Sequence, residues 1–125
     1  MAEVGVDIVD VSRIRSIYDR FGQAFMKKIL TDAEAAQCLS KPDPAASLAG
    51  RFAAKEAVSK ALGTGIAKGL GWRSIEVLNN EAGKPCVSIH APNFSGRVSL
   101  SISHDRHSAV AMALYEEGEA RKEVD

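Results

Sequence analysis

The feature that most constrains the fold is a helical segment between Asp43 and Gly63. Asp43 is a favourable N-cap, Pro44 fits the first turn, and Gly63 is a favourable C-cap. An apolar stripe about 120° wide, as expected of a core-facing helix, is formed by Leu48, Phe52, Val58 and Leu62. Arg51 and Lys55 project from the same arc, where a cation costs free energy unless it reaches water or meets an anion. The sequence therefore predicts a principal helix that faces the core and carries two cations in need of partners.

Helices are predicted before this segment and strands mainly after it. Residues 3–9 are rich in β-branched side chains and predict an N-terminal strand. Apolar residues then recur at helical spacing from Val11 to Tyr18, and Thr31 with Glu34 forms a capping box that starts a further helix. Beyond Gly71 the pattern predicts strands near residues 72–78, 86–90, 98–103 and 109–115, with turns at 79–85 and 104–107. The fold class is α+β, with helices in the first half packed on an antiparallel sheet.

Length and charge limit the classes of function. A chain of 125 residues with 46% hydrophobic residues is expected to form one domain, here 1–115, followed by a charged tail at 116–125. Sixteen basic and 16 acidic residues give zero net charge, which argues against general nucleic-acid binding. The segment 10–28 has five basic and two acidic residues (+3), whereas the tail has two and five (−3). Both are ordinarily solvated faces; alternatively, the first docks an acidic macromolecule.

The cysteines and the N-terminus indicate a compartment. Cys38 and Cys86 are too far apart for a Cys-x-x-Cys motif. No stretch approaches the ~18 apolar residues of a membrane span, and no signal-peptide pattern begins the chain. We therefore expect a cytoplasmic protein with reduced thiols.

The end of the principal helix carries the first candidate site. Glu56 and Lys60 are four residues apart on one side of the helix. On their own they predict an intrahelical salt bridge worth about 0.3–0.5 kcal/mol. The residues that follow, Gly63, Thr64 and Gly65, favour an anion-binding site, because two glycines let backbone amides and a hydroxyl approach an anion. On their own these residues would only be a helix C-cap.

Asp7 and the histidines are candidate metal ligands. Asp7 lies in an apolar strand, where a carboxylate should be paired, exposed or bound to a metal. With Glu56 it would supply two oxygen ligands for magnesium, which typically uses one or two protein carboxylates plus waters and substrate phosphates. His104 and His107, with Asp105 between them, make a poor zinc site because the turn offers no third or fourth ligand.

Several segments together resemble one family. They are, in order, Gly5-Val6-Asp7-Ile8-Val9, Phe25-Met26-Lys27-Lys28-Ile29-Leu30-Thr31 with Glu34, the lysine–glutamate helix that ends at Gly63-Thr64-Gly65, Gly83-Lys84-Pro85, and Ser101-Ile102-Ser103-His104 before an alanine-rich strand. Over residues 4–115 the chain is similar to the holo-acyl-carrier-protein synthases of the 4′-phosphopantetheinyl transferase family. Two departures stand out: Lys28 lies where members often have arginine, and the tail beyond Tyr115 has no counterpart.

The resemblance implies a magnesium-dependent enzyme of fatty acid biosynthesis. Such an enzyme transfers the 4′-phosphopantetheine arm of coenzyme A to a serine of apo-acyl carrier protein and releases adenosine 3′,5′-bisphosphate. Carried over, Asp7 and Glu56 would hold magnesium and Lys60 the pyrophosphate, the three forming the catalytic set. Glu56 or a metal-bound water would be the general base.

The resemblance also assigns roles around this set. Other phosphate contacts would come from Arg51, Gly63, Thr64 and Gly65; Phe52 and Pro85 would shape the coenzyme A pocket, with Ser103 and His104 in support. Carrier protein would bind Arg13, Arg20 and Lys28. Two other interpretations remain: an anion-binding module without metal, in which removal of Asp7 leaves ligand binding intact, and a carrier-binding adaptor that ignores coenzyme A. Burial of Asp7, Glu56 and Lys60 together would favour the enzyme.

The last predicted strand indicates an oligomer. Its alternating sets are both apolar or small: Ala109, Ala111 and Ala113 on one face, Val110, Met112 and Leu114 on the other. Helices can cover one face only, so the other should pack on copies of itself, and the alanines would permit close sheet-to-sheet approach. The resemblance implies a homotrimer with active sites at its interfaces, where residues 63–65 would meet a neighbour. A bulky charge at Ala111 or Met112 should then disrupt assembly.

Overall fold

The structure, a computed structural model, describes residues 1–66 and 70–118. Its elements are β1 (Ala2–Asp10), α1 (Val11–Phe21), α2 (Gln23–Ile29), α3 (Asp32–Leu39), α4 (Pro44–Leu62), the 3-10 helix η1 (Trp72–Ser74), β2 (Ile75–Asn79), β3 (Pro85–Ile89), β4 (Arg97–His104) and β5 (Ser108–Glu116). The predicted α+β class is confirmed, with η1 in place of the first residues of the strand predicted at 72–78. Most of the tail predicted at 116–125 lies outside the described residues. Across the described part of the chain, every helix is too short or too polar to traverse a bilayer.

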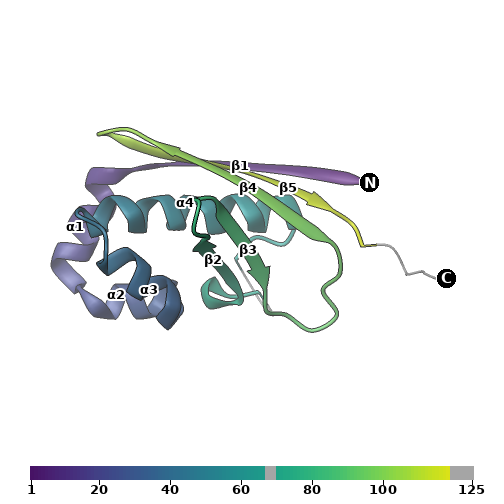
Figure 1. Ribbon diagram of the computed structural model, residues 1–125, viewed down its shortest axis with the longest axis horizontal. Helices are drawn as coiled ribbons and strands as arrows, with labels where there is room; N and C mark the ends of the chain where they lie inside the picture. The colour runs from purple at the N-terminus through teal and green to yellow at the C-terminus, as the bar shows by residue number, and fades with distance from the viewer. Residues whose placement is uncertain (67–69, 119–125) are drawn as a thin grey trace.

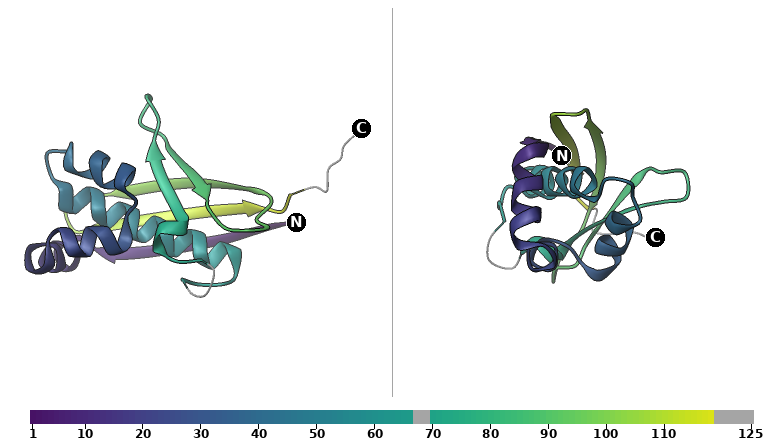
Figure 2. Two further views of the ribbon diagram at one scale, coloured as in Figure 1. Left: turned by 90° about the horizontal axis from the view of Figure 1, so that it is seen from below. Right: turned by 90° about the vertical axis from the view of Figure 1, so that its left-hand side faces the viewer.

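The strands form two antiparallel sheets instead of a single one (Figure 1). The long sheet has the order β1-β5-β4, so the N-terminal strand pairs with the last one, while β2 and β3 form a separate hairpin. Figure 1 shows α4 along one face of the long sheet, with the short helices and the hairpin on its other side. In Figure 2 the short helices gather at one end of α4. The principal helix is thus covered on both sides.

Small residues let α4 lie close against the long sheet. The inward positions of the sheet include Gly5, Ala109, Ala111 and Ala113, and those on the helix include Ala49, Ala53, Ala57 and Ala61. A Cβ atom at Gly5 would collide with the backbone of Ala57 and Ala61, so only glycine permits this approach. The alanines of β5 therefore face α4, and the prediction that they lie between packed sheets is wrong.

The outward face of the long sheet is apolar and exposed. Its members are Val4, Val6 and Ile8 on β1 and Val110, Met112 and Leu114 on β5. They face each other across the strand pair, Val4 opposite Leu114, Val6 opposite Met112 and Ile8 opposite Val110. The prediction that helices cover one apolar face and leave another is confirmed.

The caps set where the helices begin and end. The Thr31–Glu34 capping box is present in both directions, as predicted. Asp43 precedes α4, with Pro44 in its first turn, and Gly63 ends it in the left-handed conformation at φ 81°. Asp43 makes no side-chain bond to the helix, because its carboxylate binds Arg15 of α1.

Candidate active site

Asp7 and Lys60 meet where β1 crosses the second half of α4. The Lys60 Nζ donates to Asp7 Oδ1 at 3.0 Å and to the Val6 carbonyl at 3.1 Å. The close approach at Gly5, two residues before Asp7, brings the strand near enough for this contact. The Lys60 side chain is 53% exposed and that of Asp7 20%. The expectation that Lys60 is buried is therefore wrong, and its ammonium is open to solvent and ligands.

Glu56 lies half-buried one helical turn before Lys60. In the described structure Lys60 pairs with Asp7 of β1. This salt bridge between helix and strand takes the place of the intrahelical salt bridge to Glu56 that the spacing alone predicts. Within residues 1–66 and 70–118, no group of three or more His, Cys, Asp or Glu side chains is placed to hold a metal ion. The predicted site needs only two, and carboxylate oxygens from a strand and a helix are donors of the kind that magnesium prefers. The donor chemistry fits a site completed by phosphate oxygens.

The loop after α4 closes the helix through its amides. The Gly63 amide donates to the Lys60 carbonyl at 3.0 Å, and those of Thr64 and Gly65 both donate to the Ser59 carbonyl at 3.2 Å. Gly65, like Gly63, has a positive φ. These three amides are therefore used by the C-cap. The remaining anion donor predicted in this loop is the hydroxyl of Thr64.

Arg51 is buried, with a relative exposure of 4%, and lines a cavity of about 470 Å³. Its Nε donates to the Val77 carbonyl, its Nη1 to Ser47 Oγ and its Nη2 to Gln37 Oε1. These three partners are neutral, so the guanidinium keeps its full positive charge at the cavity. A buried cation of this kind favours an anionic ligand.

The same cavity gathers predicted residues from three elements, Arg51 on α4, Pro85 on β3 and His104 on β4. It also includes Lys41, together with Asp43, which was predicted only as the N-cap of the principal helix. The sequence signal that could have indicated them is the pair of charged residues, each followed by a proline, in this loop. Ser103 lies on the exposed side of β4, opposite Val110, because neighbouring strand residues face opposite ways.

Phe52 belongs to a second, apolar cavity of about 450 Å³ beside α1 and α2. Its ring stacks on Trp72 with centroids 4.9 Å apart. The lining also includes Ile17, Phe21, Ala24, Phe25, Ile29 and, at its cationic edge, Lys28. Arg20 lies over the Phe21 ring at 5.2 Å, and Arg13 is exposed on the same helix. Of the predicted docking residues, Lys28 thus lines this apolar groove and Arg20 contacts one of the rings that form it, and charge patterning did not reveal the groove.

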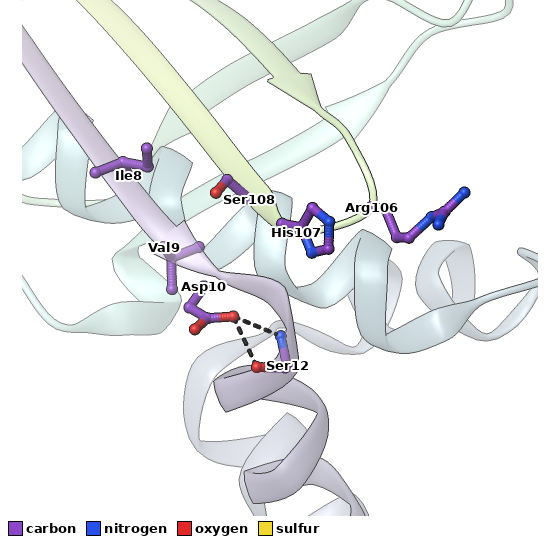
Figure 3. Close-up of a pocket in the computed structure, with 7 residues that line it drawn as sticks. All are labelled: Ile8, Val9, Asp10, Ser12, Arg106, His107 and Ser108. Atoms are coloured by element: carbon purple, nitrogen blue, oxygen red, sulfur yellow. Dashed lines mark hydrogen bonds between the residues drawn. The ribbon is translucent and has the colours of Figure 1, made fainter.

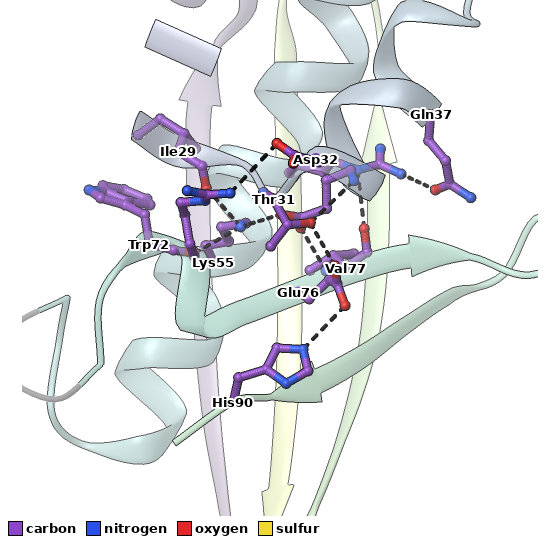
Figure 4. Close-up of polar contacts among 12 residues, drawn as sticks. Ile29, Thr31, Asp32, Gln37, Lys55, Trp72, Glu76, Val77 and His90 are labelled. Carbon is purple, nitrogen blue, oxygen red and sulfur yellow. Dashed lines mark hydrogen bonds and ion pairs between the residues drawn. The ribbon is translucent and has the colours of Figure 1, made fainter. Parts of the chain in front are cut away.

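A buried polar network supports α4 from the side opposite the sheet (Figure 4). Lys55 Nζ donates to Glu34 Oε1 at 2.7 Å and to the carbonyls of Ile29 and Trp72, each at 2.8 Å. Burial lowers the pKa of Lys55, and the Glu34 carboxylate opposes that shift. Of the two alternatives that the sequence left open for Lys55, reaching water or meeting an anion, the structure shows the second.

The two histidines of the last turn belong to different places. His104 lines the cavity of Arg51, whereas His107 lines a shallow pocket where β1 meets α1 (Figure 3). In that pocket Asp10 accepts from the amide and hydroxyl of Ser12, which lowers its pKa. Asp105 is occupied by the amides of His107 and Ser108. The geometry therefore gives no support to a zinc site here.

Comparisons with known proteins agree with this arrangement. A family model described as the 4′-phosphopantetheinyl transferase superfamily matches residues 3–114. A holo-[acyl-carrier-protein] synthase of Chlorobaculum tepidum is 83% identical over 114 residues, which cover 91% of this chain and 97% of the relative.

Solved structures share the fold. The holo-(acyl-carrier-protein) synthase of Bacillus anthracis, in complex with CoA (3′,5′-ADP), has a TM-score of 0.82 at 39% identity and covers 94% of this chain and 96% of its own. The Helicobacter pylori holo-[acyl-carrier-protein] synthase in complex with coenzyme A has a TM-score of 0.82 at 34% identity, covering 90% and 99%. The chain belongs to the 4′-phosphopantetheinyl transferase superfamily.

Proposed function

We propose that this protein is a holo-acyl-carrier-protein synthase of fatty acid biosynthesis. It transfers the 4′-phosphopantetheine arm of coenzyme A to a serine of apo-acyl carrier protein. The observation that carries the proposal is 83% identity to a holo-[acyl-carrier-protein] synthase over 91% of the chain. The serine oxygen bonds to the β-phosphorus, the bond from that phosphorus to the bridging oxygen breaks, and adenosine 3′,5′-bisphosphate leaves. The serine proton would pass to a base, and Glu56 is the candidate among this chain's own residues.

The nucleotide end of coenzyme A would occupy the cavity of about 470 Å³. Arg51 supports this assignment because it lines the cavity and its hydrogen-bond partners are neutral, so they do not offset its charge. Pro85 and His104 line the same space from β3 and β4. Thr64, at the exposed end of α4, would contact another phosphate oxygen through its hydroxyl.

Asp7 and Glu56 would hold magnesium, and Lys60 the pyrophosphate. Magnesium, when bound, would offset negative charge that develops on the leaving group. The Lys60 side chain is half-exposed, so its ammonium can turn from Asp7 to a phosphate oxygen and release the carboxylate for the cation. The strand and the helix that carry these residues are fixed against each other at Gly5.

The carrier protein would dock on α1 and α2 through Arg13, Arg20 and Lys28 around the apolar groove. We expect Arg20→Glu to raise the KM for carrier protein about tenfold at low salt and to leave the KM for coenzyme A nearly unchanged. Steady-state kinetics with each substrate varied in turn make the measurement. An unchanged KM for carrier protein would place docking elsewhere.

A homotrimer would cover the exposed apolar face of β1 and β5. An apolar surface of this extent on a small domain is typical of an interface. The trimeric state itself follows from the family resemblance, as does the contact of residues 63–65 with a neighbour. Cys38 and Cys86 are both free thiols, which suits the reducing cytoplasm.

Mass spectrometry tests the activity directly. Apo-carrier protein incubated with this protein, coenzyme A and magnesium should gain the mass of one phosphopantetheine, and a carrier variant whose acceptor serine is alanine should gain none. An adaptor or a simple anion-binding module would leave the carrier mass unchanged. That result with a folded protein would overturn the proposal.

A further inference from the structure

Arg15 joins α1 to the start of α4, although it lies in the basic segment at residues 10–28. Its Nη1 and Nη2 donate to Oδ1 and Oδ2 of Asp43 at 2.9 and 2.8 Å. Two parallel N–H···O bonds fix the orientation of both groups as well as adding Coulomb attraction. Asp43 makes no side-chain cap hydrogen bond to α4, and its carboxylate accepts the two bonds from Arg15 instead.

Asp43 also lines the cavity that contains Arg51 and His104. A carboxylate at this edge repels any phosphate that enters, because like charges brought together cost free energy. Hydrogen bonds from Arg15 hold the pKa of Asp43 below its ordinary value of 3.8, at which an aspartate is already ionised at neutral pH. Its negative charge is therefore offset by Arg15 and not by a proton.

The arginines of α1 lie on different faces of the helix. Arg13 and Arg15 are two positions apart on α1, and residues at that spacing do not share a helix face. Arg15 turns to the start of α4, and Arg20 lies over Phe21 beside the apolar groove. One basic segment thus serves two different surfaces.

We propose that Arg15 is a positioning residue for the nucleotide end of coenzyme A, which acts by neutralising and orienting Asp43 at the cavity edge. Unlike Arg13 and Arg20, it does not belong to the carrier-docking surface. The inference rests on the proposed function, because it assigns the cavity to a phosphate-bearing nucleotide.

Isothermal titration calorimetry with coenzyme A tests the inference on four proteins: wild type, Arg15→Gln, Asp43→Asn and the double variant. We expect Arg15→Gln to weaken binding about threefold at low ionic strength, less in high salt because both groups are partly exposed. Asp43→Asn should bind at least as tightly as wild type. The double variant should return to wild-type affinity, since the unmasked carboxylate is gone.

Lys27→Gln provides a charge-matched control, because it removes one positive charge from the same basic segment at an exposed site on α2. It should leave coenzyme A affinity unchanged, and thermal melting should show all variants folded. In kinetics, Arg15→Gln should raise the KM for coenzyme A and leave that for carrier protein unaltered.

Three results would overturn the inference. Arg15→Gln could bind coenzyme A as tightly as wild type, the double variant could stay as weak as Arg15→Gln, or the KM for carrier protein alone could rise. A wild-type protein that does not bind coenzyme A at all would instead defeat the proposed function, and the inference with it.

Discussion

Two lysines of α4 pair with carboxylates, and they lie in opposite environments. Lys55 meets Glu34 at 2.7 Å with both side chains 0% exposed. Lys60 meets Asp7 at 3.0 Å with side chains 53% and 20% exposed. The first pair faces the short helices and the second lies at the edge of the long sheet. Two lysines of one helix thus form the same kind of ion pair, with carboxylates of two other elements, in different surroundings.

The difference lies in how completely each pair is satisfied. Lys55 has three acceptors, the full capacity of an ammonium group, and Glu34 also accepts from the amides of Thr31 and Val77. Removal of these charges from water is costly, and only such a network compensates for it. Lys60 has two acceptors and open solvent, so a ligand can compete for it. The comparison indicates that the buried pair serves folding, and it supports the proposal that the accessible pair takes part in the chemistry.

The largest effect should come from the proposed magnesium ligands, Asp7 of the accessible pair and Glu56 beside it. Asp7→Ala or Glu56→Ala should reduce turnover on the order of 100- to 1,000-fold, as when a group that stabilises transition-state charge is removed. The melting temperature should change little, because neither side chain belongs to the buried network. Glu81→Ala, at an exposed turn carboxylate, is the matched control and should retain wild-type rates. Near-normal turnover of either active-site variant in magnesium would break the comparison.

The buried pair should show the reverse pattern. Glu34→Ala leaves the Lys55 ammonium without its anion in a dry site and should cost about 3–5 kcal/mol of unfolding free energy. Lys60→Ala should cost less than about 1 kcal/mol, because its pair is partly exposed. Chemical denaturation of both variants measures the difference. Equal losses would mean that the two pairs do the same work.

The sequence predicted the need of Lys55 but not its partner. A cation within the apolar stripe of α4 had to reach water or meet an anion, and Thr31 with Glu34 predicted a capping box. The structure shows the anion for Lys55 and the capping box. That one carboxylate serves both needs depends on how α3 packs on α4, which local periodicity does not specify. The prediction that Lys60 is buried was wrong for the same reason. The distance from β1 to α4 depends on Gly5 and a row of alanines, and no polar motif specifies it.

The pairing of strands was also beyond local patterns. Each strand of the second half was predicted within a few residues, whereas the pairing of β1 with β5 joins opposite ends of the chain. The cavity was missed because its residues come from several elements. Arg51, Gly83, Pro85, Ile102 and His104 belonged to recognised motifs, but nothing local placed those motifs around one space.

Strand β5 repeats the contrast between buried and exposed neighbours. Ala111 is 1% exposed against α4, and Met112 is 55% exposed on the outer face. Met112→Glu should dissociate the assembly and abolish activity while far-ultraviolet circular dichroism stays native, because only an interface position changes. Ala111→Glu should instead prevent folding, since it buries a charge under α4. Light scattering that shows an active Met112→Glu oligomer, or an active wild-type monomer, would place assembly on another surface.

A smaller effect than at Glu34 should appear at the outer edge of the buried network. Glu76 accepts from the Thr31 hydroxyl at 2.6 Å and lies 3.2 Å from His90 Nε2. The Thr31 hydrogen bond, with a contribution from His90, lowers the pKa of Glu76 below its ordinary 4.5. A depressed carboxyl pKa contributes stability that is fully present above pH 4.5 and is lost as the pH falls through the folded-state value. Glu76→Gln should therefore cost about 1 kcal/mol at pH 7, the worth of one hydrogen bond, and less in acid. Urea unfolding at pH 7 and at pH 3 measures both values, with Glu81→Gln as the exposed control; a loss that is the same at the two pH values would assign Glu76 a packing role and remove it from the charged network.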